Sequence, residues 1–144
     1  MTKPFSLVEE EASLSIMRTA DILFQRAAEV LKPFDLSSTQ YNVLRILRGA
    51  KGALACGQIA ERMVSRDPDV TRLLDRMEGR GLISRMRDGQ DRRVVKAKIT
   101  GKGLSMLEEI HPQITAYHRK QFVSFGEKKL KQLITWMEEI RRTS

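Results

Sequence analysis

Residues 67–81, DPDVTRLLDRMEGRG, carry the clearest helix signals in the chain. Asp67 is expected to cap the helix and Pro68 to occupy its first position, because an acidic cap followed by proline is typical of a helix start. Gly81 is expected to end the helix, since glycine is common just past a helix C-terminus.

One face of this helix is apolar at helical spacing and carries Val70, Leu73, Leu74 and Met77. The opposite face carries Asp69, Arg72, Arg76 and Arg80. The stretch therefore predicts a short amphipathic helix with a basic outer face.

A short turn at residues 64–66 connects this helix to a brief helix expected over residues 58–63. The inward face of the brief helix is expected to comprise Ile59, Ala60 and Met63. Ser37 and Gln40 have the spacing of a capping box, so an earlier helix is expected to begin there and to end at Gly49. Two short helices joined by a tight turn form the helix-turn-helix arrangement.

After Gly81 the apolar pattern changes from helical to alternating. Residues 82–87 and 94–99 are expected to pair as a β-hairpin around a polar tip at residues 88–91. In the second strand Val95, Ala97 and Ile99 alternate with Lys96 and Lys98. The predicted fold is mainly α, a winged helix-turn-helix with a two-stranded β-hairpin wing over residues 37–102.

A long helix is expected before this unit. Ser6 and Glu9 have capping-box spacing, and the helix should end near Lys32 because proline at position 33 disfavours helix in the residue before it. Its apolar stripe includes Met17, Ala20, Phe24, Ala27 and Leu31. This stripe is wider than one short neighbour can cover, which predicts a partner.

Two more helices are expected after the hairpin. Thr100 should cap the first, which Pro112 is expected to kink rather than end. Ser124 with Glu127, or Gly126 alone, is expected to start the last helix. Its apolar positions are Leu130, Leu133, Ile134, Met137 and Ile140.

The net charge of +8 is concentrated in one part of the chain. Residues 62–102 hold 12 basic and 6 acidic side chains, a net charge of +6, whereas residues 1–40 hold 4 basic and 6 acidic, a net charge of −2. Such a cluster predicts an electrostatic footprint for nucleic acid, with a merely solvated basic face as the alternative.

Other classes of protein are disfavoured. No apolar run approaches 18 residues and the N-terminus lacks a signal-peptide layout, so a cytoplasmic protein without a membrane span is expected. The single cysteine, Cys56, fits a reducing compartment and is interpreted as a buried or cap-position residue rather than a redox switch. His111 and His118 lack a cluster of metal ligands beside them. We expect no cofactor, no metal and no catalytic residues.

Four stretches, in this order and at these separations, resemble the MarR (multiple antibiotic resistance regulator) family of transcription factors over nearly the whole chain. They are residues 58–63 (QIAERM), 70–78 (VTRLLDRME) with 81–83 (GLI), 91–93 (DRR) and 99–103 (ITGKG). The resemblance implies a single domain over residues 1–144, with a DNA-binding lobe at 37–102 and dimerisation helices at 1–36 and 103–144. Residues expected at the dimer interface are Met17, Phe24, Leu130, Ile134 and Met137.

In a helix-turn-helix, side chains near the start of the recognition helix reach the base edges. Arg72 is placed to bind guanine, Thr71 to touch a thymine methyl or a phosphate, and Arg66 and Arg76 to bind phosphates. Pro68 and Asp69 complete this expected surface. For Arg76 the alternative is an ion pair with the neighbouring acids Asp75 or Glu78. Gly57 and Gln58, at the start of the preceding helix, could hold a further phosphate.

On the wing, Arg93 matches the family's arginine that enters the minor groove, with Asp91 orienting it. The alternative for this pair is a salt bridge that only stiffens the hairpin. Arg87, Arg92 and Lys96 are expected to contact the DNA backbone.

The function implied is that of a homodimeric, sequence-specific regulator of transcription, most simply a repressor, on a pseudo-palindromic operator with half-sites about 10–10.5 base pairs apart. A small aromatic or lipophilic effector bound between the two regions would release the DNA. The alternative is a winged-helix protein-interaction module without specific DNA readout.

Overall fold

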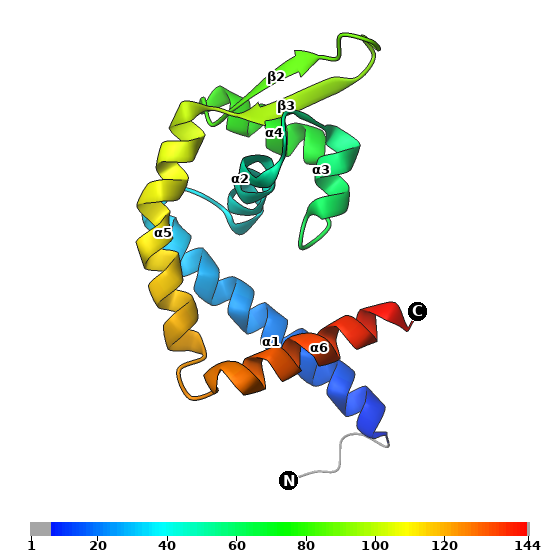
Figure 1. Cartoon of the computed structure of the whole chain (residues 1–144), viewed down its shortest axis with the longest axis vertical. Coiled ribbons are helices and arrows are strands. Elements are labelled where there is room, and N and C mark those ends of the chain that lie inside the picture. The colour runs from blue at the N-terminus through cyan, green and yellow to red at the C-terminus, as the bar shows by residue number, and fades with distance from the viewer. Residues whose placement is uncertain (1–6, 144) are drawn as a thin grey trace.

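The computed structural model describes residues 7–143 and contains the predicted order of a long helix, three short helices, a hairpin and two further helices (Figure 1). The helices are α1 (Val8–Leu31), α2 (Ser38–Gly49), α3 (Cys56–Arg62), α4 (Val70–Gly79), α5 (Gly101–Gln121) and α6 (Gly126–Arg142), with a 3-10 turn η1 (Lys32–Phe34) after α1. The strands are β1 (Leu54–Ala55), β2 (Ile83–Arg87) and β3 (Val95–Ile99). The mainly helical, winged helix-turn-helix fold is confirmed.

The helix-turn-helix and the sheet lie at one end of the molecule, and α1 and α6 lie at the other (Figure 1). Helix α5 joins the two ends. Within the helix-turn-helix end, α2, α3 and α4 pack beneath the hairpin formed by β2 and β3. This lobe is the part that carries most of the positive charge.

Side-chain caps confirm two predicted helix starts. The Ser37 hydroxyl accepts a hydrogen bond from the Gln40 amide at 3.1 Å, and the Gln40 side chain accepts one from the Ser37 amide at 3.1 Å. The Thr100 hydroxyl accepts a hydrogen bond from the Gly103 amide, also at 3.1 Å. Helix α5 continues through Pro112, so this proline does not end the helix.

The start of α4 differs from the prediction, because Asp69 rather than Asp67 is the N-cap residue. Asp69 Oδ1 accepts a hydrogen bond from the Arg72 amide at 3.0 Å. Asp67 Oδ1 instead accepts one from the Asp69 amide at 2.8 Å, which closes a turn around Pro68. The predicted end is right: Gly81 takes a left-handed φ of 75°, and its amide and that of Leu82 bond back to the last turn of α4.

Three other predictions concern the caps of α1 and α6 and the inward face of α3. Helix α6 starts at Gly126 without a side-chain cap, so the capping role predicted for Ser124 is wrong. Ala60 is exposed rather than inward, because it lies about 100° around α3 from Ile59, which faces the core. The predicted cap Ser6 lies outside the described residues, and Leu7 precedes α1.

The sheet has three antiparallel strands in the order β1-β3-β2, one more than predicted. In β2 and β3, Ile83 pairs with Ile99 and Arg87 with Val95. The additional strand, β1, pairs Leu54 with Ala97 and contains only two residues. Such a short segment carries no alternating pattern, so the sequence gives no signal for it.

One continuous core connects the two ends of the molecule. Its fully buried side chains come from nearly every element and include Leu31, Leu44, Ile59, Met77, Leu82, Ile83 and Ile110. Leu31 is the last residue of α1 and lies in this core, and Ile110 lies in it on α5, which packs against α2. The lobe is therefore packed onto α5 rather than tethered to it.

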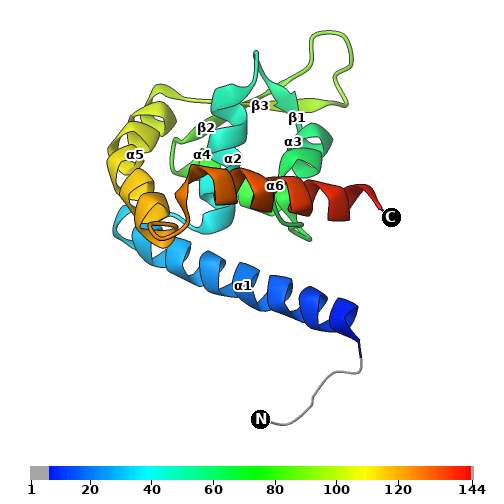
Figure 2. The ribbon, with the colours of Figure 1, turned by 60° about the horizontal axis from the view of Figure 1, so that its bottom comes forward.

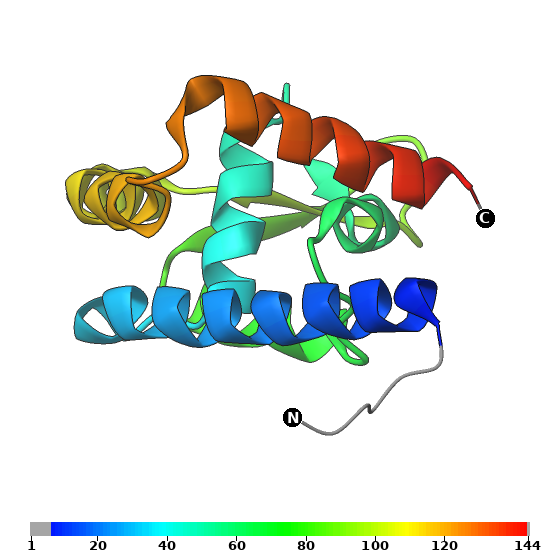
Figure 3. The ribbon, with the colours of Figure 1, turned by 90° about the horizontal axis from the view of Figure 1, so that it is seen from below.

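Helices α1 and α6 present apolar side chains that their own chain leaves uncovered. Met17 on α1 is 58% exposed and Ile134 on α6 is 55% exposed, and α6 has no buried residue. In both tilted views α1 and α6 lie apart from each other rather than side by side (Figures 2 and 3). None of the helices within residues 7–143 is long and apolar enough to cross a membrane.

Candidate nucleic-acid interface

The outer face of α4 carries exposed side chains near its N-terminus. Thr71, Arg72 and Arg76 are all exposed, while the apolar stripe of the same helix lies in the core. Arg72 and Arg76 are one turn apart, where two positive charges repel each other in the absence of an anion. Asp69 caps the helix with one of its carboxylate oxygens, and its role in base readout stays a prediction.

The turn before α4 is held in place by α2. The Val64 amide donates a hydrogen bond to the Asn42 side-chain oxygen at 2.8 Å, so α2 fixes the backbone just ahead of Arg66. Arg66 and Pro68 are both exposed in this turn. The structure therefore places Arg66 beside the start of α4, as the sequence predicts.

Gln58 and Cys56 belong to the start of α3. The Gln58 side-chain oxygen accepts a hydrogen bond from the Ala55 amide at 2.9 Å, so this oxygen caps the helix, and Gly57 is exposed beside it. The Cys56 thiol lies 4.0 Å from the Thr71 hydroxyl, so α3 and α4 approach each other here. No group of three metal-ligating side chains occurs within residues 7–143.

The wing tip is shaped by short-range hydrogen bonds. Asp91 accepts bonds from the backbone amide and from Nε of Arg93, at 3.1 and 3.2 Å, and the Arg93 side chain remains 92% exposed. Arg87 donates to the Arg92 carbonyl at 2.7 Å. Lys96 lies 3.5 Å from an Asp88 carboxylate oxygen, so its charge is partly compensated. Asp91 thus orients an arginine that projects into solvent.

Arg85 links the wing to α4, and this link was absent from the predicted site. Its guanidinium bonds Glu78 at 2.9 Å and also contacts Asp75, and its backbone amide bonds the second Glu78 oxygen at 3.1 Å. These are the two acids that were the alternative partners of Arg76. Arg85 occupies both acids, and Arg76 has no ion-pair partner within residues 7–143. Arg85 lies 7 residues after Glu78 and 10 residues after Asp75, on the other side of the turn at Gly81. Because the chain changes from helix to strand between them, neither helical nor strand periodicity predicts this contact.

The ion pair has a defined pH dependence. Hydrogen bonding to Arg85 holds the pKa of Glu78 below its ordinary value of 4.5. A carboxylate with a lowered folded-state pKa stabilises the fold above its unfolded pKa, and this contribution is lost as the pH falls through the folded pKa. Glu78→Gln should therefore be less stable than the parent protein at pH 7, and the two should converge below pH 4.5. Urea unfolding from pH 7 downward, with exposed Glu61→Gln on α3 as the control, measures this. A pH-independent difference would contradict the assigned ion pair.

A helix-turn-helix with an exposed arginine face, an arginine-tipped hairpin and an ion-paired link between them defines the chain as a winged helix-turn-helix protein of the DNA-binding type. Residues 36–95 match the MarR family model. A MarR transcription factor from Planctomyces limnophilus is 37% identical, with 93% of this chain and 98% of that chain covered and a TM-score of 0.71. The chain belongs to the MarR family, whose members are transcription regulators and not enzymes.

Two further relatives agree with this assignment. The HTH-type transcriptional regulator YsmB of Bacillus subtilis is 27% identical over 132 residues, 89% of this chain and 90% of its own length. The transcriptional repressor CouR, solved bound to a 23-mer DNA duplex, has a TM-score of 0.84 at 23% identity, covering 99% of this chain and 100% of that chain. At this identity the likeness to CouR concerns the fold.

Proposed function

We propose that this MarR-family protein is a cytoplasmic, homodimeric repressor that reads a pseudo-palindromic operator. The observation that carries the proposal is that Arg72 and Arg93 are exposed on two different elements of one lobe, whose hairpin is linked to α4 through Arg85. Arg72 would bind guanine in the major groove, and Arg93 would enter a narrow, A·T-rich minor groove. Arg66, Arg76, Arg87 and Arg92 would hold the flanking phosphates. The resemblance in fold to CouR, which was solved on DNA, supports this arrangement.

The proposed dimer interface consists of α1, α6 and the end of α5. The uncovered apolar residues on α1 and α6 provide a surface that a second copy can bury. In this proposal residues 1–36 and 103–144 form the dimerisation region and residues 37–102 form the DNA-binding lobe. Two lobes related by a twofold axis require a palindromic site.

The proposed effector site is a cavity of about 380 Å³ between α1, α2 and α5. Phe24, Ala27 and Ile114 supply apolar walls, while Arg45 and His118 supply polar groups for a small aromatic acid. Val64, in the turn before α4, also lines the cavity, so an occupant would contact the segment that positions the recognition helix. Release then requires tighter binding to the conformation that does not fit DNA. A rise in melting temperature with benzoate or phenylacetate, together with loss of DNA binding, would support this site.

Selection from a pool of random duplexes tests the DNA-binding proposal. The protein should enrich an inverted repeat, and the logarithm of its affinity should fall steeply with the logarithm of salt concentration, because phosphate contacts release counterions. An unenriched pool or salt-insensitive binding would instead favour a protein-interaction module.

Replacement of single arginines should separate the two readout modes. Arg72→Ala is expected to relax base preference at one position in each half-site, at a cost of about 1–3 kcal/mol in discrimination. Arg93→Ala should weaken binding most at A·T-rich flanks. Lys96→Ala should weaken binding to all sequences alike, and only slightly, because Asp88 already compensates its charge. Affinity profiles on the selected site and its single-base variants measure these effects, and equal losses for all three variants would contradict the assigned roles.

A further inference from the structure

The DNA-binding lobe is connected to α1 and α5 by two passages of the chain. One is the corner between α1 and α2, residues 32–37, and the other is the step from β3 into α5, residues 100–103. These passages are more than 60 residues apart in the sequence. Both meet the C-terminal end of the recognition helix α4, at residues 80–82.

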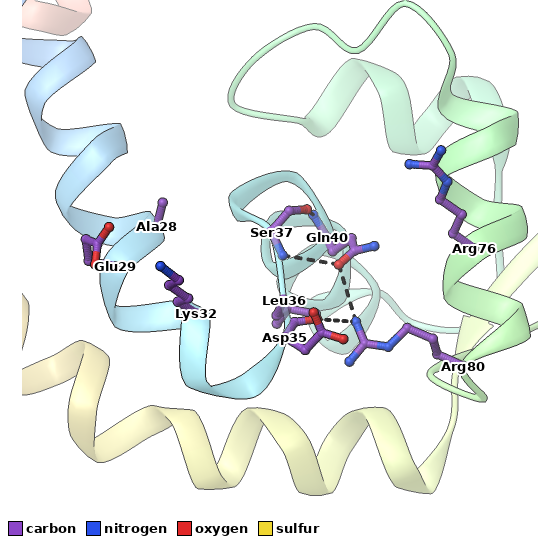
Figure 4. Close-up of a pocket in the computed structure, with 9 residues that line it drawn as sticks. All are labelled: Ala28, Glu29, Lys32, Asp35, Leu36, Ser37, Gln40, Arg76 and Arg80. Atoms are coloured by element: carbon purple, nitrogen blue, oxygen red, sulfur yellow. Dashed lines mark hydrogen bonds between the residues drawn. The ribbon is translucent and has the colours of Figure 1, made fainter.

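The first passage is bound by the Arg80 side chain. Its guanidinium donates to the Asp35 carbonyl oxygen at 2.5 Å and lies 3.5 Å from the Gln40 side-chain oxygen (Figure 4). It also donates to the Phe34 carbonyl oxygen at 3.3 Å. Asp35 is left-handed, with φ 51°, at the point where the chain turns from α1 towards α2. Arg80 therefore binds the corner itself. The sequence placed Arg80 on the outer face with Arg72, whereas the structure directs it into this contact.

The second passage is bound by the backbone at the same end of α4. Lys102 Nζ donates to the Arg80 carbonyl at 2.7 Å, and the Thr100 hydroxyl donates to the Gly81 carbonyl at 2.6 Å. The Thr100 amide also bonds the Leu82 carbonyl at 3.1 Å. One residue, Arg80, thus contacts the α1 side through its guanidinium and the α5 side through its carbonyl.

We propose that Arg80 and Lys102 are positioning residues that set the angle of the recognition helix relative to the dimerisation helices, and through it the half-site spacing that the dimer accepts. The inference rests on the proposed DNA-binding function. Arg72 lies eight residues before Arg80, about 12 Å along the helix. A rotation of about 15° about the fixed end would displace Arg72 by about 3 Å, close to the 3.4 Å rise of one base pair. Loss of the contacts at Arg80 should therefore broaden the range of half-site spacings that the dimer accepts. The lobe should stay attached, because α2 still packs against α5.

Affinity for operators of altered spacing tests this proposal. The DNA probe is the inverted repeat that the parent protein selects from the random pool, together with versions whose half-sites are one base pair closer or further apart. The parent protein should lose about tenfold or more in affinity on the shifted sites, since each lost base contact costs about 1–3 kcal/mol. Arg80→Met keeps the aliphatic stem and removes the donors, and should lose less than about threefold on the same sites. Arg80→Lys should restore part of the discrimination.

Matched variants separate positioning from general effects. Arg48→Met removes the same charge from an exposed position on the same lobe and should keep the spacing profile of the parent protein. Lys102→Met removes the contact on the α5 side at an exposed residue and should also broaden the spacing profile. This variant tests the inference even if Arg80→Met does not fold. Spacing profiles identical to the parent in Lys102→Met and in every folded Arg80 variant would overturn the inference. A parent protein that selects no inverted repeat would overturn the proposed function instead.

Discussion

Ile134→Asp is expected to convert the dimer into monomers and to lower operator affinity by about 100-fold or more, because a dimer gains the effective concentration of its second lobe and a monomer does not. Ile134 lies on the apolar stripe of α6 and is 55% exposed in the isolated chain. In the proposed dimer this surface is buried against the second copy, and an unpaired carboxylate there is strongly disfavoured. Sedimentation gives the oligomeric state, and fluorescence anisotropy with the selected operator gives the affinity.

The neighbouring residue provides a matched control for this substitution. Thr135 is exposed and lies off the apolar stripe, and its hydroxyl donates to the Lys131 carbonyl one turn earlier, at 3.0 Å. Thr135→Asp adds the same charge to the same turn and should leave the dimer and its affinity nearly unchanged. An Ile134→Asp protein that remains dimeric would show that α6 is not the interface, and parallel losses in both variants would point to the charge alone.

Gly103→Ala is expected to lower the free energy of unfolding by about 3 kcal/mol, the upper end of the cost of overpacking a core. A β-carbon at this buried position would lie 2.5 Å from the Leu82 carbonyl oxygen and 2.7 Å from Cγ1 of Ile99. The first of these atoms is backbone, so the first turn of α5 would have to move away from the sheet. Urea unfolding at a fixed protomer concentration measures the change.

A second glycine in the same turn serves as the control. A β-carbon at Gly101 would meet no atom within 4 Å, and the residue is exposed. Gly101→Ala should therefore be neutral or stabilise the protein by up to about 1 kcal/mol through the helix propensity of alanine. If Gly103→Ala proved as stable as Gly101→Ala, the close approach of α5 to Leu82 would be wrong.

The recognition helix shows what sequence patterns predict well. Its apolar stripe and its end at Gly81 follow from spacing and from the conformational freedom of glycine, both of which are local properties. The sequence predicts its start two residues too early, because Asp67 and Asp69 are both acceptable caps. The choice depends on the turn around Pro68, which is a matter of three-dimensional geometry.

The candidate site was predicted less completely for the same reason. Arg72 and Arg93 could be selected because a helix face and a hairpin tip follow from local spacing. Arg80 and Arg85 could not, since their partners lie on other elements, 45 residues away for Arg80 and across a chain reversal for Arg85. Charge alone does not distinguish an arginine that would contact DNA from one that bonds to another element of its own chain. Only the packed structure separates the two kinds.

The wing tip differs from α4 in how its shape is specified. The hydrogen bonds described for it involve Asp88, Asp91 and Arg93 and their immediate neighbours, all within residues 87–96. Helix α4, in contrast, is bonded to the α1–α2 corner, the sheet and the start of α5. The shape of the tip is therefore specified locally, and replacing the tip by grafting should leave the core undisturbed. In the proposed DNA complex, exchanging the tip should therefore change the preference for flanking sequence while leaving the preference for the bases read by α4 intact.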